Sequence, residues 1–390
     1  MNVPKWLPLL LGFVSAVGPL ATDMYLPGLP AIETEFAAAA GASQITLAAW
    51  LLGLGIGQVM QGTLSDRFGR RWPLLLGMGL FTVSSVGCAL ASGMAGLAVW
   101  RVLGAIGGSA GMVIPRAIVR DHVTGNRAAR LMSQQMLVMG AAPILAPSLG
   151  GLLINVTGWR GIFWFQAGFG VAAIVLAAWA LPDSLAPQDR MRVDLIGLLR
   201  RWRAILIEPV FAAHALVAGS VALAVFAYLG GVPGIYQHRF GLTPVGSGQM
   251  FGANALAFIA ATQINGLLAV RVGSARLLGW GVGLFAVSSA AVAVFCFGGI
   301  SGFWGLTIPL TAMLAATGWM SPNAAVGALA RHAGQAGSAS ALLGTVQYGL
   351  GAIGGATVAM LAGAGTVPMG AVMLAASVLA VVAARLRPRG

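Results

Sequence analysis

The sequence predicts an all-α, polytopic membrane protein with twelve transmembrane helices in two six-helix pseudo-repeats. The 390 residues are 58% hydrophobic and only 8% charged, and their mean hydropathy is +0.89. The apolar residues gather in runs of about 20, the length that spans a bilayer as a helix. Most arginines fall between alternate runs, as expected when basic loops remain on the cytoplasmic side.

The apolar runs predict six spans in each half of the chain. In the first half they are expected near residues 6–27, 44–65, 73–93, 96–118, 131–156 and 161–181. In the second half they are expected near residues 210–233, 250–270, 277–298, 303–329, 338–362 and 367–384. An even number of spans places both termini on one side of the membrane, and Lys5 and Arg389 make that side cytoplasmic.

The longest hydrophilic stretch, residues 183–209, separates an N-terminal half (1–182) from a C-terminal half (210–390). Within it, Leu195, Leu199 and Trp202 recur at helical spacing against a set of arginines. This pattern predicts a cytoplasmic linker with a short amphipathic helix on the inner membrane surface. An ordinary solvated linker is the alternative.

The two halves share a repeated pattern. With one fixed offset, Gly62, Leu64, Arg67 and Gly69 correspond to Gly266, Leu268, Arg271 and Gly273. Such duplication is typical of secondary transporters, whose substrate site lies between the repeats. The same offset places uncharged residues opposite two acids and one arginine of the first half: Ala227 for Asp23, Val270 for Asp66 and Gly305 for Arg101. We therefore expect proton chemistry in the first half.

Several other classes of protein are disfavoured. The net charge of +13 marks membrane topology, so no nucleic-acid partner is implied. Cys88 and Cys296 lie inside apolar runs and the four histidines lack ligand spacing, so no metal site, disulfide or cofactor is expected. No phosphate-binding loop of the Gly-x-x-x-x-Gly-Lys-[Ser/Thr] type occurs, which argues against ATP as the energy source.

Five motifs carry a resemblance to a known family. "GTLSDRFGRR" (62–71) resembles the cytoplasmic signature loop of the major facilitator superfamily. Four further stretches resemble the bicyclomycin/chloramphenicol resistance (Bcr/CflA) subfamily of drug:proton antiporters. They are "TDMYLPGLP" (22–30), "IPRAIVRD" (114–121), "APILAPSLGG" (142–151) and "SPNAAVGALARHAGQAGSASALLG" (321–344). The resemblance implies alternating access and export of small drugs against inward proton flow. One departure is Gly104, which stands where that subfamily usually has glutamine.

Asp23 and Arg101 are the candidates for proton coupling. An ionised carboxylate inside a bilayer costs about 3 kcal/mol or more, so intramembrane acids usually face a cavity and carry function. Pro27 and Pro30 are expected to bend or end the helix beyond Asp23. Arg101 would act as a fixed cation, and the resemblance places such an arginine in the central cavity. The alternatives are solvation of Asp23 at the outer interface and snorkelling of Arg101.

Three residues near the cytoplasmic surface are candidates for a conformational latch. Asp66 is expected to meet the N-terminal end of the eleventh helix, near Gly337 and Ser338, where free N–H groups favour an anion. Arg70 is expected to pair with Asp121 at the end of the fourth span. Together these contacts would hold the inner ends of the halves closed.

The candidate cavity residues are polar or adaptable side chains inside apolar runs, which interhelical packing would also explain. They are Tyr25, Met136, Tyr228, Asn254, Phe258, Gln263, Asn265 and Asn323. A kink with close helix packing is predicted in the fifth span, where the resemblance implies a cavity seal. Its residues are Pro143, Pro147, Gly150 and Gly151.

The leading hypothesis is a proton-driven multidrug exporter, with phenicols and bicyclomycin as the first substrates to test. It would act as a monomer in a bacterial inner membrane, with the proton gradient as its only energy source. A same-fold transporter of an amino acid or polyamine remains open. A membrane enzyme would need paired carboxylates or metal ligands, and the nine acidic residues are widely spread. A channel would need a filter loop, which is not apparent.

Overall fold

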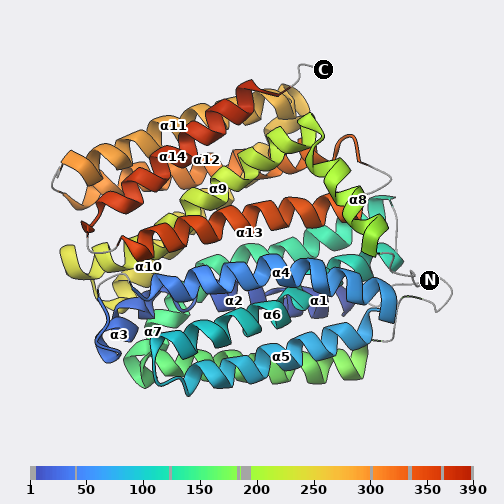
Figure 1. The fold of residues 1–390 in the computed structure, drawn as a ribbon, viewed down its shortest axis with the longest axis horizontal. Helices are drawn as coiled ribbons and strands as arrows, with labels where there is room; N and C mark the ends of the chain where they lie inside the picture. The colour runs from blue at the N-terminus through green and yellow to red at the C-terminus, as the bar shows by residue number, and fades with distance from the viewer. Residues whose placement is uncertain are drawn as a thin grey trace.

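The computed structural model describes residues 6–39, 42–122, 125–181, 185, 195–298, 302–332, 336–361 and 364–387. Every regular element in these ranges is a helix (Figure 1). The helices run roughly along one direction, with the first half and the second half forming two neighbouring layers (Figure 1). The prediction of an all-α membrane protein is confirmed.

The first half contains a broken first span and four long helices. The first span consists of α1 (Leu7–Ser15), α2 (Val17–Thr22), the 3₁₀ turn η1 (Leu26–Gly28) and α3 (Leu29–Glu35). The long helices are α4 (Gln44–Phe68), α5 (Arg71–Ala89), α6 (Met94–His122) and α7 (Gly125–Ala180). Positive φ and extended ψ at Gly158 (69° and −179°) interrupt α7, which therefore holds the predicted fifth and sixth spans.

The second half begins after α8 (Leu195–Leu206), a short helix within the segment 183–209. The elements that follow are α9 (Pro209–Gly234), the π turn η3 (Ile235–Arg239), α10 (Pro244–Val272), α11 (Ser274–Gly298), α12 (Phe303–Leu329), α13 (Ala336–Met360) and α14 (Val367–Arg385). The predicted start of the eighth span near residue 250 is too late. Pro244 suits the first turn of a helix, and the Thr243 hydroxyl caps it by accepting from the N–H of Gly246.

Ten helical segments in the described residues are long and apolar enough to cross a membrane. One of them, Leu145–Ala180, contains the two spans that meet at Gly158. The remaining span is α13, which is less apolar because it carries Gln347, Tyr348 and several glycines. The twelve predicted spans are therefore present.

The repeat in the sequence has a counterpart in the backbone. Gly69 follows the end of α4 with φ 88°, and Gly273 follows the end of α10 with the same φ. Residues with side chains rarely adopt this conformation, which explains why both repeats keep a glycine there. The short loops after α4 and α10 are thus equivalent turns.

The two halves meet along two pairs of helices. In the first half α6 packs against α4 and α5, and in the second half α11 packs against α12 and α14. Contacts across the halves run mainly between α4 and α13 and between α7 and α10. The two chain ends and α8 lie at the same end of the bundle (Figure 1). We call this the terminal end; it corresponds to the side predicted to be cytoplasmic.

Candidate functional site

A cavity of about 420 Å³, here called the central cavity, lies between the two halves. Its walls are mostly apolar with a few polar groups, as is usual for small-molecule sites. The first half contributes the first span, α4, α6 and α7, and the second half contributes α9, α10, α12 and α13. The lining residues that matter below are Asp23, Met112, Pro147, Tyr228, Phe251, Asn254, Phe258, Thr317, Ser321, Gln347 and Tyr348.

Asp23 lines the central cavity at the break in the first span. Helix α2 ends at Thr22 and η1 begins at Leu26, so Asp23 lies in the turn between two helical pieces. Pro27 and Pro30 stand in the first turns of η1 and α3, where a missing N–H leaves no bond unmade. Asp23 is half-buried, and it is the only carboxylate among the described residues that line this cavity.

Arg101 is buried inside the first half, 1% exposed, and is not part of the cavity wall. Its Nη1 donates to the carbonyl oxygen of Ala21 at 2.8 Å, just before Asp23. The guanidinium lies 4.4 Å from the centre of the Tyr25 ring and 4.5 Å from that of Trp50, which are cation–π distances. Within the described residues Arg101 forms no ion pair with Asp23. It binds the backbone that carries this carboxylate.

Tyr25 likewise faces Arg101 and not the central cavity. Its side chain is fully buried, and its hydroxyl bonds to the Thr46 hydroxyl. Gly104, the departure from the subfamily pattern, lies near Ser84 and Trp50: a Cβ at this position would lie 3.3 Å from Ser84 Cβ and 3.5 Å from Trp50 Cζ3. Gly104 therefore packs beside the indole ring that contacts Arg101.

The second-half wall of the central cavity contains a neutral polar network. Asn254 Nδ2 donates to the Tyr228 hydroxyl at 3.0 Å, and Thr311 Oγ1 donates to Asn254 Oδ1 at 2.7 Å. Tyr228 and Asn254 are buried in the fold but still contribute to the cavity lining. Phe258, on the same helix as Asn254, adds apolar surface. The structure thus brings these three predicted residues to one wall, opposite Asp23.

The predicted kink region of α7 packs closely at the inter-half boundary. Pro147 lines the central cavity. A Cβ at Gly150 would lie 1.8 Å from the Met24 carbonyl oxygen, and one at Gly151 would lie 2.8 Å from the Pro244 carbonyl oxygen. These glycines allow α7 to contact the first span and α10. The side chains of Pro143 and Met136 lie outside the described residues.

The remaining predicted amides lie away from the central cavity. Asn323 Nδ2 donates to Asn265 Oδ1 at 2.6 Å, and Ser274 Oγ donates to Asn323 Oδ1 at 2.7 Å. Both asparagines are buried, so this network joins α10, the start of α11 and α12. Gln263 is exposed and lines neither of the cavities described here.

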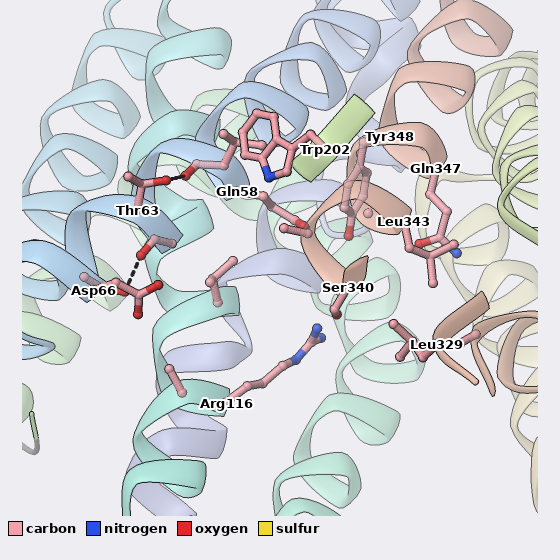
Figure 2. Close-up of a pocket in the computed structure, with 18 of the residues that line it drawn as sticks. Gln58, Thr63, Asp66, Arg116, Trp202, Leu329, Ser340, Leu343, Gln347 and Tyr348 are labelled. Carbon is pink, nitrogen blue, oxygen red and sulfur yellow. Dashed lines mark hydrogen bonds between the residues drawn. The ribbon is translucent and has the colours of Figure 1, made fainter. Parts of the chain in front are cut away.

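A second cavity of about 480 Å³, here called the inner cavity, is lined by Asp66, Arg70 and Asp121 and by Trp202 of α8. Because α8 lies at the terminal end (Figure 1), this cavity lies toward that end, and Figure 2 shows Asp66 among its lining residues. Arg70 pairs with Asp66 and donates from Nε to Asp121 Oδ2 at 2.9 Å. Burial lowers the pKa of Arg70, but its hydrogen bonds to the two aspartates outweigh this and raise the pKa. The burial and contacts of Gly337 and Ser338, near which Asp66 was expected, lie outside the described part of the chain.

The halves are in contact at the end opposite the termini. Gln237 Nε2 donates to the carbonyl oxygen of Pro27 at 3.1 Å. A Cβ at Gly248 would lie 2.5 Å from the Pro147 carbonyl oxygen, so α10 and α7 also approach closely. Gln347 and Tyr348 line both cavities, so the central cavity and the inner cavity adjoin at α13. These contacts between the halves lie at the end opposite the termini, and the inner cavity lies toward the terminal end.

Sequence reasoning assigned no role to four residues of the inner cavity: Arg116, Trp202, Gln347 and Tyr348. Arg116 entered the sequence analysis only as part of the stretch "IPRAIVRD" (114–121). Trp202 was attributed to the apolar face of the linker helix. Gln347 and Tyr348 are adjacent polar residues in an otherwise apolar run, a pattern that could have identified α13 as a cavity helix.

A family model described as "Major Facilitator Superfamily" matches residues 11–356. The chain belongs to this superfamily. It is 34% identical to an uncharacterised MFS-type transporter, YdgK, of Bacillus subtilis over 382 residues, 96% of this chain and 93% of the relative. A chloramphenicol resistance protein of Pseudomonas aeruginosa is 31% identical over 90% of this chain and 84% of its own length. A bicyclomycin resistance protein homologue of Haemophilus influenzae is 26% identical over 96% of this chain and 94% of its own.

These relatives confirm the resemblance to the bicyclomycin/chloramphenicol resistance subfamily. The fold is also similar to a solved structure of a bacterial homologue of the lysosomal transporter Spinster in an inward-facing, occupied conformation. The TM-score is 0.78 at 16% identity, covering 99% of this chain and 97% of that one. The chain is therefore a multi-pass membrane protein with the fold of this transporter superfamily.

Proposed function

We propose that this major facilitator protein is a proton-coupled exporter of small antibiotics. The observation that carries the proposal is Asp23, the sole carboxylate among the described residues lining the central cavity. It lies at a helix break and faces the neutral second-half wall. A carboxylate in this position can bind either a proton or the cargo, but not both at once. An antiporter needs this mutual exclusion to couple the two movements.

Proton and cargo are exchanged because the central cavity opens in turn to each side of the membrane. When the central cavity faces the cytoplasm, cargo binding displaces the Asp23 proton inward. When the cavity faces outward, a proton from the outside neutralises Asp23 and releases the cargo. Because each proton moves inward as cargo moves outward, the proton gradient supplies the energy and no cofactor is needed. Arg101 supports this step by holding the Ala21 carbonyl oxygen beside the Asp23 turn.

The chemistry of the cavity wall favours small aromatic or amphiphilic cargo. Phe251 and Phe258 offer ring contacts, while Asn254 and Ser321 offer hydrogen bonds. A volume of about 420 Å³ suits a molecule of drug size. The names of the Pseudomonas and Haemophilus relatives make phenicols and bicyclomycin the first cargoes to test.

The Asp66, Arg70 and Asp121 group is proposed to act as the conformational latch. In the present arrangement its described ion pairs lie within the first half. Closure of the inner cavity would bring the free face of Asp66, whose side chain is 45% exposed, against the second half. We place the protein as a monomer in a bacterial inner membrane with both termini in the cytoplasm, since the basic loops lie toward that side.

The test is protection of a drug-sensitive host across an antibiotic panel by the wild type and by Asp23→Asn at equal membrane levels. The wild type is expected to protect and Asp23→Asn to give the growth of the empty host. Glu35→Gln is the matched control, since it removes an exposed carboxylate that binds Arg160 outside the central cavity. Equal protection by wild type and Asp23→Asn would remove Asp23 from the mechanism.

A further inference from the structure

The inner cavity contains groups that proton exchange at Asp23 does not use. Arg116 of α6, Trp202 of α8, and Gln347 and Tyr348 of α13 all line it (Figure 2). They combine one cation, two aromatic rings and one amide, a set that can recognise a ligand. The cavity volume of about 480 Å³ leaves room for a small molecule.

Arg116 is the charged group of this cavity that remains available. Its side chain is half-buried and reaches across the cavity toward Ser340 (Figure 2). It forms no ion pair or hydrogen bond with the residues that the structure describes. The other described charges there, Asp66, Asp121 and Arg70, are engaged with one another. A partly desolvated guanidinium presents a planar fork of donors that suits a carboxylate or a similar oxyanion.

Trp202 supplies an aromatic face and an unused donor. It belongs to α8, in the segment between the two halves, and is half-buried at the cavity wall. Its Nε1 is buried and has no hydrogen-bond partner in the described part of the chain. Buried indole N–H groups usually find a partner, so this one is arranged for a group that is not part of the described fold. Tyr348 provides a second ring at the same cavity.

The position of these groups places them beside the central cavity. Gln347 and Tyr348 line the inner cavity and the central cavity alike. A molecule held by Arg116 and Trp202 is therefore already next to the residues that form the wall of the central cavity.

We propose that Arg116, Trp202 and Tyr348 form a binding site in the inner cavity that selects aromatic molecules carrying an oxyanion. The oxyanion binds the Arg116 guanidinium, and the ring of the ligand packs against Trp202 and Tyr348. Binding at the inner cavity does not rest on the proposed function. No movement of the oxyanion to Asp23 is implied, because its charge would repel the ionised carboxylate.

The test is binding of two matched probes to the purified full chain by isothermal titration. The probes are 4-(dimethylamino)benzoate and 4-(dimethylamino)benzamide, which share a ring and differ in the anionic group. Arg116→Gln is expected to weaken binding of the benzoate about tenfold or more and that of the benzamide less than about twofold. Arg116→Lys should keep part of the benzoate affinity because it keeps the charge. Trp202→Leu should weaken both probes several-fold.

Arg276→Gln is the control, because it removes an exposed arginine that is outside both cavities. It should change neither affinity. Unchanged benzoate binding in Arg116→Gln, or an equal loss of both probes, would overturn the site. Loss of benzoate binding in Asp23→Asn with none in Arg116→Gln would move the ligand to the central cavity and also overturn it. Failure of Asp23-dependent drug protection would instead overturn the proposed export and leave this binding result standing.

Discussion

The two inner loops of the repeat have the same backbone and different chemistry. After α4, Gly69 turns the chain and Arg70 binds Asp66 and Asp121, which ties α4 to α6 by charge. After α10, Gly273 turns the chain and Ser274 binds Asn323, which ties the start of α11 to α12 by neutral hydrogen bonds. In the internal repeat Ser274 occupies the position that corresponds to Arg70.

The two loops thus differ in whether their contacts are neutral hydrogen bonds or ion pairs. A neutral, buried network holds one geometry, because leaving its polar groups unpaired is costly. A charged network at a cavity wall can exchange partners when water or another charge arrives. The central cavity shows the same difference between the halves, since Asp23 of the first half shares it with the neutral Asn254 and Tyr228 of the second half. In these loops and in the central cavity, the first half supplies the ionisable groups and the second half supplies neutral hydrogen bonds.

The largest expected effect comes from removing the carboxylate of Asp23 while keeping the size of the side chain. Asp23→Asn should reduce drug-dependent transport in everted vesicles to background, because the amide cannot carry the exchanged proton. Asn254→Ala should keep coupling and weaken apparent drug affinity about threefold to tenfold, the effect of one lost hydrogen bond. The measurement is drug uptake driven by an imposed pH gradient. Residual coupled transport in Asp23→Asn would remove the distinction between the two halves.

The next effect compares the two inner loops. Arg70→Ala should lower the free energy of unfolding by about 3 kcal/mol, because Asp121 and Asp66 lose their counter-charge in a partly buried site. Ser274→Ala should lower it by about 1 kcal/mol, the loss of one neutral hydrogen bond. Thermal unfolding of both variants in the same detergent provides the comparison. Equal shifts in Tm would show that charge adds nothing to the first-half loop.

A smaller effect tests the packing of α7 at the boundary between the halves. Gly150→Ala should destabilise the fold by about 1–3 kcal/mol, since its Cβ would lie 1.8 Å from the Met24 carbonyl oxygen. Gly266→Ala is the matched change in the second half, where a Cβ would meet nothing within 4 Å. It should raise stability by about 0.5 kcal/mol through better helix propensity. A neutral Gly150→Ala in thermal unfolding would contradict the close contact.

The smallest effect concerns the charged cluster at the start of α9. Glu208 caps this helix by accepting from the N–H groups of Val210 and Phe211. Burial alone would raise the pKa of Glu208, but these hydrogen bonds outweigh it and lower the pKa below 4.5. Its contribution is therefore present above about pH 4.5 and is lost as pH falls through the lowered pKa. Glu208→Ala should cost about 1 kcal/mol in neutral thermal unfolding, and less in acid.

The spans could be predicted from sequence because a bilayer imposes a length and an apolar composition on each helix. The importance of Asp23 could also be predicted, because an acid inside an apolar run is unusual. The rotation of each helix about its own axis could not be predicted. In a membrane both the lipid-facing and the protein-facing sides are apolar, so hydropathy does not reveal which side meets the cavity.

Particular residues show this limit. Asn254 lines the central cavity, Asn265 is buried against Asn323, and Gln263 is exposed, although all three lie on α10. Tyr25 lies close to Asp23 in the chain but faces Arg101. Such contacts depend on how the helices pack against one another. Motif reasoning indicated the important segments but not the direction of each side chain.

The central claim is that Asp23 gives up a proton when cargo binds. The direct measurement is proton release on addition of chloramphenicol to purified protein in weakly buffered detergent solution, followed with a pH indicator. Release that saturates with the drug in the wild type and is absent from Asp23→Asn is the predicted result. Drug binding of equal affinity in both proteins, with no protons released by either, would contradict the exchange.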